Sequence, residues 1–134
     1  MRADWYQTAM AIARAITIRS EDPYVKVGAC ILRRDHSVAS VGFNGAPPDV
    51  DIDWSNRELR RTKVIHAETN ALRYIRPKEG WLIAVTLLPC PECLKNIASY
   101  QIPVVAYGDV SPNYDSKTVF DLALEFNITM VQIK

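Results

Sequence analysis

Hydrophobic positions recur at two spacings along this chain, and these spacings divide its first part into a helix and two strands. An apolar stripe at helical spacing predicts a helix within residues 4–20, and Asp4 with Gln7 has the form of a capping box at its start. The stripe consists of Trp5, Ala9, Ile12, Ala13 and Ile16. Residues 25–34 and 37–44 are rich in β-forming residues and flank a short polar turn, so they predict a hairpin.

Beyond the hairpin, helical and strand patterns alternate. Residues 44–56 contain paired prolines with scattered Asp and Asn, and they predict a loop. The elements expected after it are helices at 66–75, 91–100 and 116–126, the last capped by Asp115 or Ser116, and strands at 82–88, 103–108 and 128–133. Such alternation builds a largely parallel sheet between helices, so we expect an α/β fold that forms one domain over residues 1–134.

Composition narrows the class of protein. The chain has 134 residues, of which 49% are hydrophobic, and this is typical of one globular domain. Sixteen basic and fifteen acidic residues leave a net charge of +1, which predicts no broad surface for nucleic acid or a membrane. The longest apolar run, residues 81–89, is too short to cross a bilayer, and no signal-peptide core follows Met1. We therefore expect a cytoplasmic protein.

The three cysteines suggest metal or redox chemistry, because their number is odd and no secretory signal accompanies them. Cys90 follows the strand at 82–88, and Cys93 lies in the first turn of the next helix, with Pro91 where helices accept proline. Ligands of open sheets lie beyond the carboxyl ends of the strands. A helix N-terminus also favours the thiolate, which suits a redox pair and a metal site equally. Spacing alone leaves both open.

The two histidines separate these alternatives. His36 lies in the polar turn of the hairpin and is expected to be an exposed turn residue. His66 opens a helix, and Glu68 follows two positions later. Taken alone, this tripeptide indicates only a helix start with a favourably placed acid, but together with Cys90 and Cys93 it supplies three of the ligand types that zinc prefers.

The sequence offers no convincing fourth protein ligand for the zinc. Cys30 is the only other cysteine, and within its strand it is expected to be a buried free thiol. Zinc with three protein ligands keeps a position open for water and lowers the pKa of that water, which is typical of a catalytic site. Glu68 is then free to move protons between the water and a substrate.

His66-Ala67-Glu68 followed by Pro89-Cys90-Pro91-Glu92-Cys93 resembles the signature of zinc-dependent nucleobase deaminases. Longer stretches resemble the deoxycytidylate (dCMP) deaminases in the same order over nearly the whole chain. They read "RSEDPYVKVGACIL", "GFNGAP", "HAETNAL", "LLPCPEC" and "YDSKTVFDLALEFNI". This resemblance implies the three-layer α/β/α cytidine-deaminase-like fold with a five-stranded mixed sheet, and conversion of dCMP to dUMP in pyrimidine deoxynucleotide metabolism, which supplies dUMP for dTMP synthesis. It also implies one catalytic zinc per subunit and a homo-oligomer, usually a hexamer, activated by dCTP with Mg²⁺ and inhibited by dTTP.

Site residues follow from the same resemblance. It implies that His66, Cys90 and Cys93 hold zinc and that Glu68 is the proton shuttle. It further implies a substrate-binding set of Arg19, Ser20, Asn44, Ala67 and Tyr114. Alternatives stay open, since Asn44 also suits a turn, Tyr114 a loop over the core and Arg19 a helix C-terminus.

The loop after the second strand departs from the family pattern. Phe43 stands where a tyrosine is common, and "APPDV" lacks the usual final glycine, so this loop is expected to be stiffer than in the family. The residues expected to contact a regulatory nucleotide are Asn44, Gly45, Ala46 and Asp49. The acidic and basic runs around this loop are each typical of a solvated face. Alternatively, Asp49 or Asp51 meets magnesium and Arg57, Arg60 or Arg61 meets phosphates at a subunit interface.

Other functions share parts of this pattern. A tRNA adenosine deaminase or a deaminase of free cytidine or deoxycytidine would carry the same zinc residues, and a deaminase acting on dCTP would differ in a few loop contacts. The near-neutral charge argues against tRNA. Outside the deaminases, a thioredoxin-like dithiol or a zinc-stabilised binding module without activity remains an alternative.

Overall fold

A computed structural model describes all residues from 1 to 134. Its helices are α1 (Trp5–Ile16), the 3₁₀ turn η1 (Thr17–Arg19), α2 (Arg57–Lys63), α3 (Ala67–Leu72), α4 (Pro91–Ser99) and α5 (Ser116–Glu125). Its strands are β1 (Gly28–Arg33), β2 (Val38–Phe43), β3 (Gly80–Leu87), β4 (Val104–Asp109) and β5 (Thr129–Gln132). None of the helices combines the length and the apolar character needed to span a membrane.

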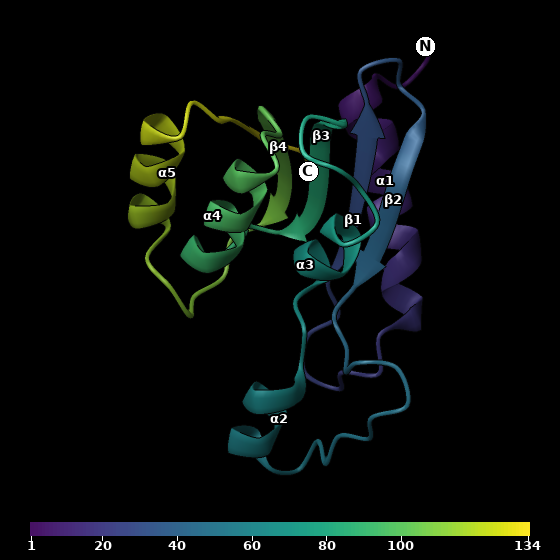
Figure 1. Cartoon of the computed structure of the whole chain (residues 1–134), viewed down its shortest axis with the longest axis vertical. Coiled ribbons are helices and arrows are strands. Elements are labelled where there is room, and N and C mark those ends of the chain that lie inside the picture. Colours follow the sequence, from purple (N-terminus) through teal and green to yellow (C-terminus); the bar gives the residue numbers. More distant parts are fainter.

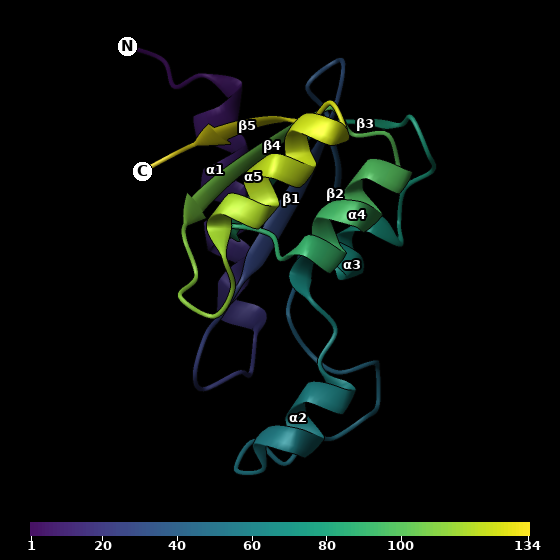
Figure 2. The ribbon, with the colours of Figure 1, turned by 90° about the vertical axis from the view of Figure 1, so that its left-hand side faces the viewer.

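The strands form one mixed sheet in the order β2-β1-β3-β4-β5. Strand β1 is antiparallel to both β2 and β3, whereas β3, β4 and β5 run parallel. Helix α1 covers one face of this sheet, and α3, α4 and α5 cover the other (Figures 1 and 2). The predicted three-layer α/β/α fold with a five-stranded mixed sheet is therefore confirmed.

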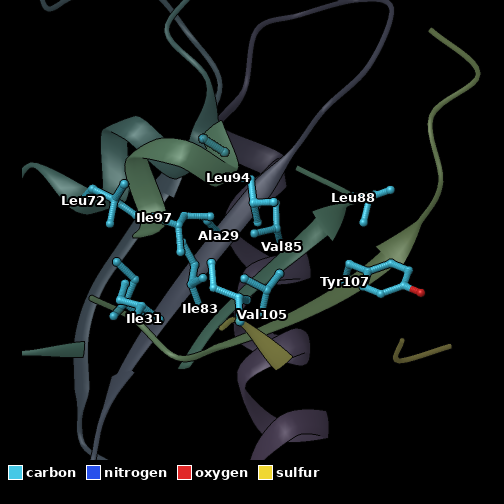
Figure 3. Packing of buried hydrophobic residues seen from close by; sticks show 14 of the residues in the cluster. Ala29, Ile31, Leu72, Ile83, Val85, Leu88, Leu94, Ile97, Val105 and Tyr107 are labelled. Atoms are coloured by element: carbon cyan, nitrogen blue, oxygen red, sulfur yellow. The ribbon is translucent and has the colours of Figure 1, made fainter. Parts of the chain in front are cut away.

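Alternate residues of the central strands form two cores. In β1, Ala29 and Ile31 belong to the larger cluster under α3, α4 and α5, whereas Cys30 and Leu32 face α1. The larger cluster also contains Ile83 and several residues of the neighbouring strands (Figure 3). Because side chains alternate across a strand, burial on both faces requires the nearly continuous apolar runs that the sequence shows.

Two helical segments differ from expectation. The helix predicted at 66–75 ends at Leu72, since Tyr74 and Ile75 donate to carbonyls three residues back and leave the α-helical pattern. Helix α2 was not predicted at all. It contains no buried residue, so it has no apolar stripe for the sequence pattern to show, and its start is capped by Asn56, which accepts from the Leu59 N–H.

The expectation of an exposed His36 was wrong, and Trp5 is not buried although it fits the apolar stripe of α1. Trp5 is 45% exposed and lies outside the buried face of α1, which consists of Ala9, Met10 and Ala13. His36 is half-buried, because its ring stacks on Trp5 with centroids 4.7 Å apart and lies against Trp81 at 5.3 Å. The hairpin turn is therefore covered by aromatic rings from α1 and β3.

Candidate metal centre and adjoining cavities

Two loop-to-helix junctions bring His66, Cys90 and Cys93 together. His66 is the N-cap residue of α3, and Cys90 is the N-cap residue of α4. The His66 Nδ1 atom lies 3.1 Å from the Cys93 Sγ and 3.7 Å from the Cys90 Sγ. All three ligand atoms lie within 4.8 Å of one another. Residues separated by 24 and 27 positions along the chain therefore form one cluster.

The chain before His66 is held by backbone pairing. Gly45 and Ile65 exchange two backbone hydrogen bonds of 3.1 and 2.8 Å, and the Asn70 side chain donates to the Phe43 carbonyl. Strand β2 also approaches α3 closely at Gly42, where a Cβ would lie 2.5 Å from backbone atoms of α3. These contacts place the start of α3, and hence the imidazole, at the end of the sheet.

The cysteine turn is fixed in a similar way. The Leu88 N–H donates to the Asp109 carbonyl over 2.7 Å, and this bond extends the pairing of β3 and β4 to the residues before Cys90. Pro91 begins α4, and the Cys93 N–H points to the Cys90 sulfur over 3.5 Å. Cys93 is buried in the first turn of the helix. Both sulfurs therefore come from a short segment with little freedom.

The protonation preferences of this cluster suit metal binding. Hydrogen bonds from Cys93 and then His66 lower the pKa of the Cys90 thiol to about 4. The hydrogen bond to Cys90 raises the pKa of His66, and the Cys93 thiol has a raised pKa because it bonds to Cys90 and is buried. These pKa shifts favour a thiolate at Cys90, and they favour protons on His66 and Cys93 that a bound cation would displace.

The three donors fit zinc in type and spacing. Zinc–nitrogen bonds of about 2.0 Å and zinc–sulfur bonds of about 2.3 Å in a tetrahedron place ligand atoms roughly 3.5 to 3.8 Å apart, close to the separations observed here. The Cys30 thiol belongs to the core between the sheet and α1, and burial raises its pKa to about 11. The prediction of a buried free Cys30 is confirmed, and no further His, Cys, Asp or Glu joins the group of three.

A cavity of about 270 Å³, here called the inner cavity, opens beside this cluster. Its wall includes Asn44, His66, Ala67, Glu68, Cys90 and Tyr114. Glu68 is only 4% exposed, and burial raises the pKa of its carboxyl group. A carboxyl group that binds a proton readily at the wall of a cavity is suited to proton transfer.

The structure brings three of the five predicted substrate contacts to the inner cavity. Ala67 lies there beside Glu68. The Tyr114 hydroxyl donates to the Leu88 carbonyl, and burial raises the pKa of the phenol. The Asn44 side chain accepts from the Val27 N–H over 2.8 Å and donates to Asp22 and to the Val25 carbonyl. Its role in substrate binding stays a prediction, since these bonds also hold the loop.

Arg19 and Ser20 lie elsewhere. The Ser20 hydroxyl is buried, donates to the Asn44 carbonyl over 2.9 Å and accepts from the Asp22 N–H. Arg19 lines a separate cavity of about 580 Å³ formed by the loop after β2, together with Gly45, Ala46 and Asp49. Three of the four residues expected at a regulatory site therefore share a cavity with Arg19, whereas Asn44 lies at the inner cavity.

A second chamber of about 550 Å³, here called the outer chamber, joins the inner cavity. The two share Asp22, Val25, Val64, His66 and Asn113. The sequence analysis assigned no role to Asp22, Val25, Val64 or Asn113, although three of them lie in or beside stretches that resemble the family. The position of these three residues within or next to such a stretch was the signal that could have identified them.

An α/β/α sandwich with one histidine, two cysteines and a buried glutamate at neighbouring helix starts is the arrangement of a zinc-dependent deaminase. The family model described as the cytidine and deoxycytidylate deaminase zinc-binding region matches residues 3–109. The chain belongs to this family, as its motifs indicated.

Relatives and solved structures agree with this assignment. The chain is 38% identical over 120 residues to an uncharacterised deaminase of Aliivibrio fischeri, covering 87% of this chain and 81% of the relative. It is 31% identical over 142 residues to human deoxycytidylate deaminase, covering 98% and 79%. Its fold is similar to dCMP deaminase of the cyanophage S-TIM5 in complex with dCMP and dUMP, with a TM-score of 0.79, 23% identity and 99% of each chain covered.

Proposed function

We propose that this protein is a zinc-dependent dCMP deaminase that converts dCMP and water to dUMP and ammonia. The observation that carries the proposal is the buried Glu68 carboxyl group on the same cavity wall as His66 and Cys90, with Cys93 completing the donor set. The similarity to relatives named deoxycytidylate deaminase supports dCMP as the substrate.

The chain's own groups divide the chemical work. Zinc held by His66, Cys90 and Cys93 would supply an acidified water as the nucleophile for C4 of the cytosine ring. Glu68 carries the protons: its carboxylate accepts one from the water and delivers it to ring N3. It then takes the remaining proton from the oxygen that has bonded to C4 and passes it to the amino group, which leaves as ammonia as the C4–N bond breaks and the C4 carbonyl forms. The raised pKa of Glu68 allows it to hold each proton between these transfers.

Apolar side chains complete the inner cavity. Val27, Leu87 and Leu88 line it beside the polar groups named above. Such a wall packs against the faces of a flat pyrimidine ring and limits water to the reacting side. We infer that the base lies in the inner cavity with its amino group toward Glu68.

The test compares four substrates. The purified protein is incubated with dCMP, dCTP, deoxycytidine and CMP, and the uracil product of each is followed by chromatography. We expect dCMP to be deaminated with the highest kcat/KM. Activity on deoxycytidine alone would contradict the nucleotide assignment, and no activity on any of the four would contradict the deaminase proposal. Preference for dCTP would move the assignment to a triphosphate deaminase.

Regulation by nucleotides is a finer part of the proposal. The cavity of the loop after β2 is lined by Arg19, Asp49 and Asp51. Arg19 offers a contact for phosphate, and the two aspartates offer ligands for magnesium. We propose that dCTP with Mg²⁺ activates and that dTTP inhibits at this cavity. Saturation with dCMP is measured with and without each triphosphate, and unchanged hyperbolic curves would contradict this regulation.

Assembly, location and pathway complete the proposal. We propose a homohexamer, which light scattering after gel filtration tests directly. Three free cysteines suit a reducing compartment such as the cytoplasm. In that setting, the product dUMP is a precursor for dTMP synthesis.

The low pKa of Cys90 favours one alternative, a dithiol redox protein. In that case Cys90 and Cys93 react with a thiol reagent at the same rate before and after treatment with a chelator. Under the deaminase proposal, bound zinc protects both thiols and the chelator exposes them. Thiol titration therefore separates the two functions without an activity assay.

A further inference from the structure

Helix α2 lines the outer chamber with cations. Arg57, Arg60 and Arg61 all contribute to its wall. Their spacing of three and four residues puts them on one face of the helix. None of the three takes part in a salt bridge, because the ion pairs of the structure join Arg33 to Glu79, Lys95 to Glu92 and Lys117 to Asp121. Three guanidinium groups without a carboxylate partner thus converge on one chamber.

The single carboxylate in the chamber wall does not neutralise them. Asp22 is 5% exposed, and its side chain accepts from the Tyr24 and Val25 N–H groups over 2.8 and 3.2 Å. Its second oxygen accepts from the Asn44 amide. These bonds hold the Asp22 carboxylate in its own loop. Its single negative charge is outnumbered by the three guanidinium groups, so the chamber keeps a positive field next to the inner cavity.

Arg60 is held in a defined position. Its guanidinium carbon lies 4.2 Å from the centroid of the Tyr24 ring, and the Tyr24 hydroxyl donates to the Trp54 carbonyl over 3.0 Å. A guanidinium stacked on an aromatic ring keeps its N–H edge free for a bidentate anion. Phosphate is the anion whose geometry matches this fork.

We propose that Arg57, Arg60 and Arg61 bind the 5′-phosphate of the nucleotide whose base occupies the inner cavity. The inference rests on the proposed function for the position of the base. The outer chamber shares His66 and four further residues with the inner cavity, so the two adjoin and leave room for one ligand to extend from one into the other. These arginines then make the protein select a nucleotide over the corresponding nucleoside, with Arg60 as the main contact.

Equilibrium binding tests this selectivity without turnover. Dissociation constants for dCMP and deoxycytidine are measured by calorimetry in the Glu68→Gln background, where bound ligand is not consumed. Adding Arg60→Gln is expected to weaken dCMP binding about 10- to 100-fold, the range for a hydrogen bond to a charged group, and to leave deoxycytidine binding unchanged. Arg60→Lys keeps the charge but loses the planar fork, so its dCMP affinity should lie between that of Arg60→Gln and that of the Glu68→Gln parent.

Arg34 provides the matched control. It is exposed in the β1–β2 turn, at the opposite end of the molecule from α2 (Figure 1), and Arg34→Gln removes the same charge. The dCMP affinity of the Arg34→Gln variant should equal that of the Glu68→Gln parent. The proposal is overturned if Arg60→Gln leaves dCMP affinity unchanged, or if it weakens both ligands equally. Absence of deamination in the unmodified protein would contradict the proposed function instead, and the binding comparison would still test the arginines.

Discussion

The candidate metal centre and the α2 arginines border connected chambers but are held by different parts of the molecule. Helices α3 and α4 bury one face against the sheet, and their N-termini carry His66, Glu68, Cys90 and Cys93. Residues 46–64, here called the arm, leave this body at the Gly45–Ile65 bridge and carry α2, which has no buried residue and projects away from the sheet (Figure 2). The donor residues, whose chemistry depends on their spacing, lie on packed helices. The arginines proposed to recognise a charged group lie on an exposed segment.

Loss of a ligand in the body should have the largest effect. Cys93→Ala removes one of three donors, so we expect loss of tightly bound zinc and no detectable deamination, as measured by elemental analysis and product formation. Cys30→Ala is the matched control, since it also removes a buried thiol, but from the core under α1. It should lower the melting temperature and keep one zinc per chain. Full zinc occupancy in Cys93→Ala would contradict the proposed ligand set, and two tightly held zincs in the parent would contradict a single site.

Removal of the proton shuttle should have the next largest effect. Glu68→Gln is expected to lower kcat by about a thousandfold while zinc content stays unchanged, because the proposed function has this group move protons and gives it no role as a ligand. Glu92 is the matched control: it occupies the first turn of α4 as Glu68 occupies that of α3, but it is exposed and pairs with Lys95. Glu92→Gln should retain full kcat. A Glu68→Gln protein that still turns over at the parent rate would remove the assigned role.

Packing between β2 and α3 should have a smaller but measurable effect. The Cβ of Gly42→Ala would lie 2.5 Å from backbone atoms of Ala67 and Ala71, which cannot move aside without shifting the helix. We expect a loss of roughly 1–3 kcal/mol in the free energy of unfolding. In Gly45→Ala, the nearest atoms are 3.7 Å away on Phe43, so unfolding by denaturant should show little change. Equal destabilisation by both changes would show that the close approach is not the cause.

Removal of a helix N-cap side chain should have the smallest effect, and one such change in each region compares the arm with the body. Asn56→Ala removes the cap of α2 and should cost about 1 kcal/mol of local helix stability. Because α2 carries the proposed phosphate contacts, KM for dCMP should rise a few-fold while the melting temperature stays constant. Asp4→Ala removes the capping box of α1, so it should lower the melting temperature and leave KM unchanged. Similar effects of both variants on both measurements would contradict the division between body and arm.

The predictability of the fold follows the same division. The strands and helices of the body have periodic apolar residues because they bury one or two faces, so their positions were close to those predicted from sequence. The seven-residue helix α2 buries nothing and left no such pattern. Trp5 fits the apolar stripe of α1, yet it packs on His36, a contact that depends on the hairpin folding back over the helix.

By itself the sequence determined the elements of the body, because apolar residues at regular spacings specify local backbone structure, and its motifs indicated His66, Cys90 and Cys93 as a group of donors that could hold a metal. The tertiary structure decided which of these parts meet. The sheet order β1-β3-β4 brings the starts of α3 and α4 together, so that the imidazole of His66 reaches the Cys93 sulfur. The tertiary structure also places three arginines of an ordinary basic run in the wall of a chamber beside His66. Strand order and helix facing depend on how the whole chain packs, and local patterns carry little information about either.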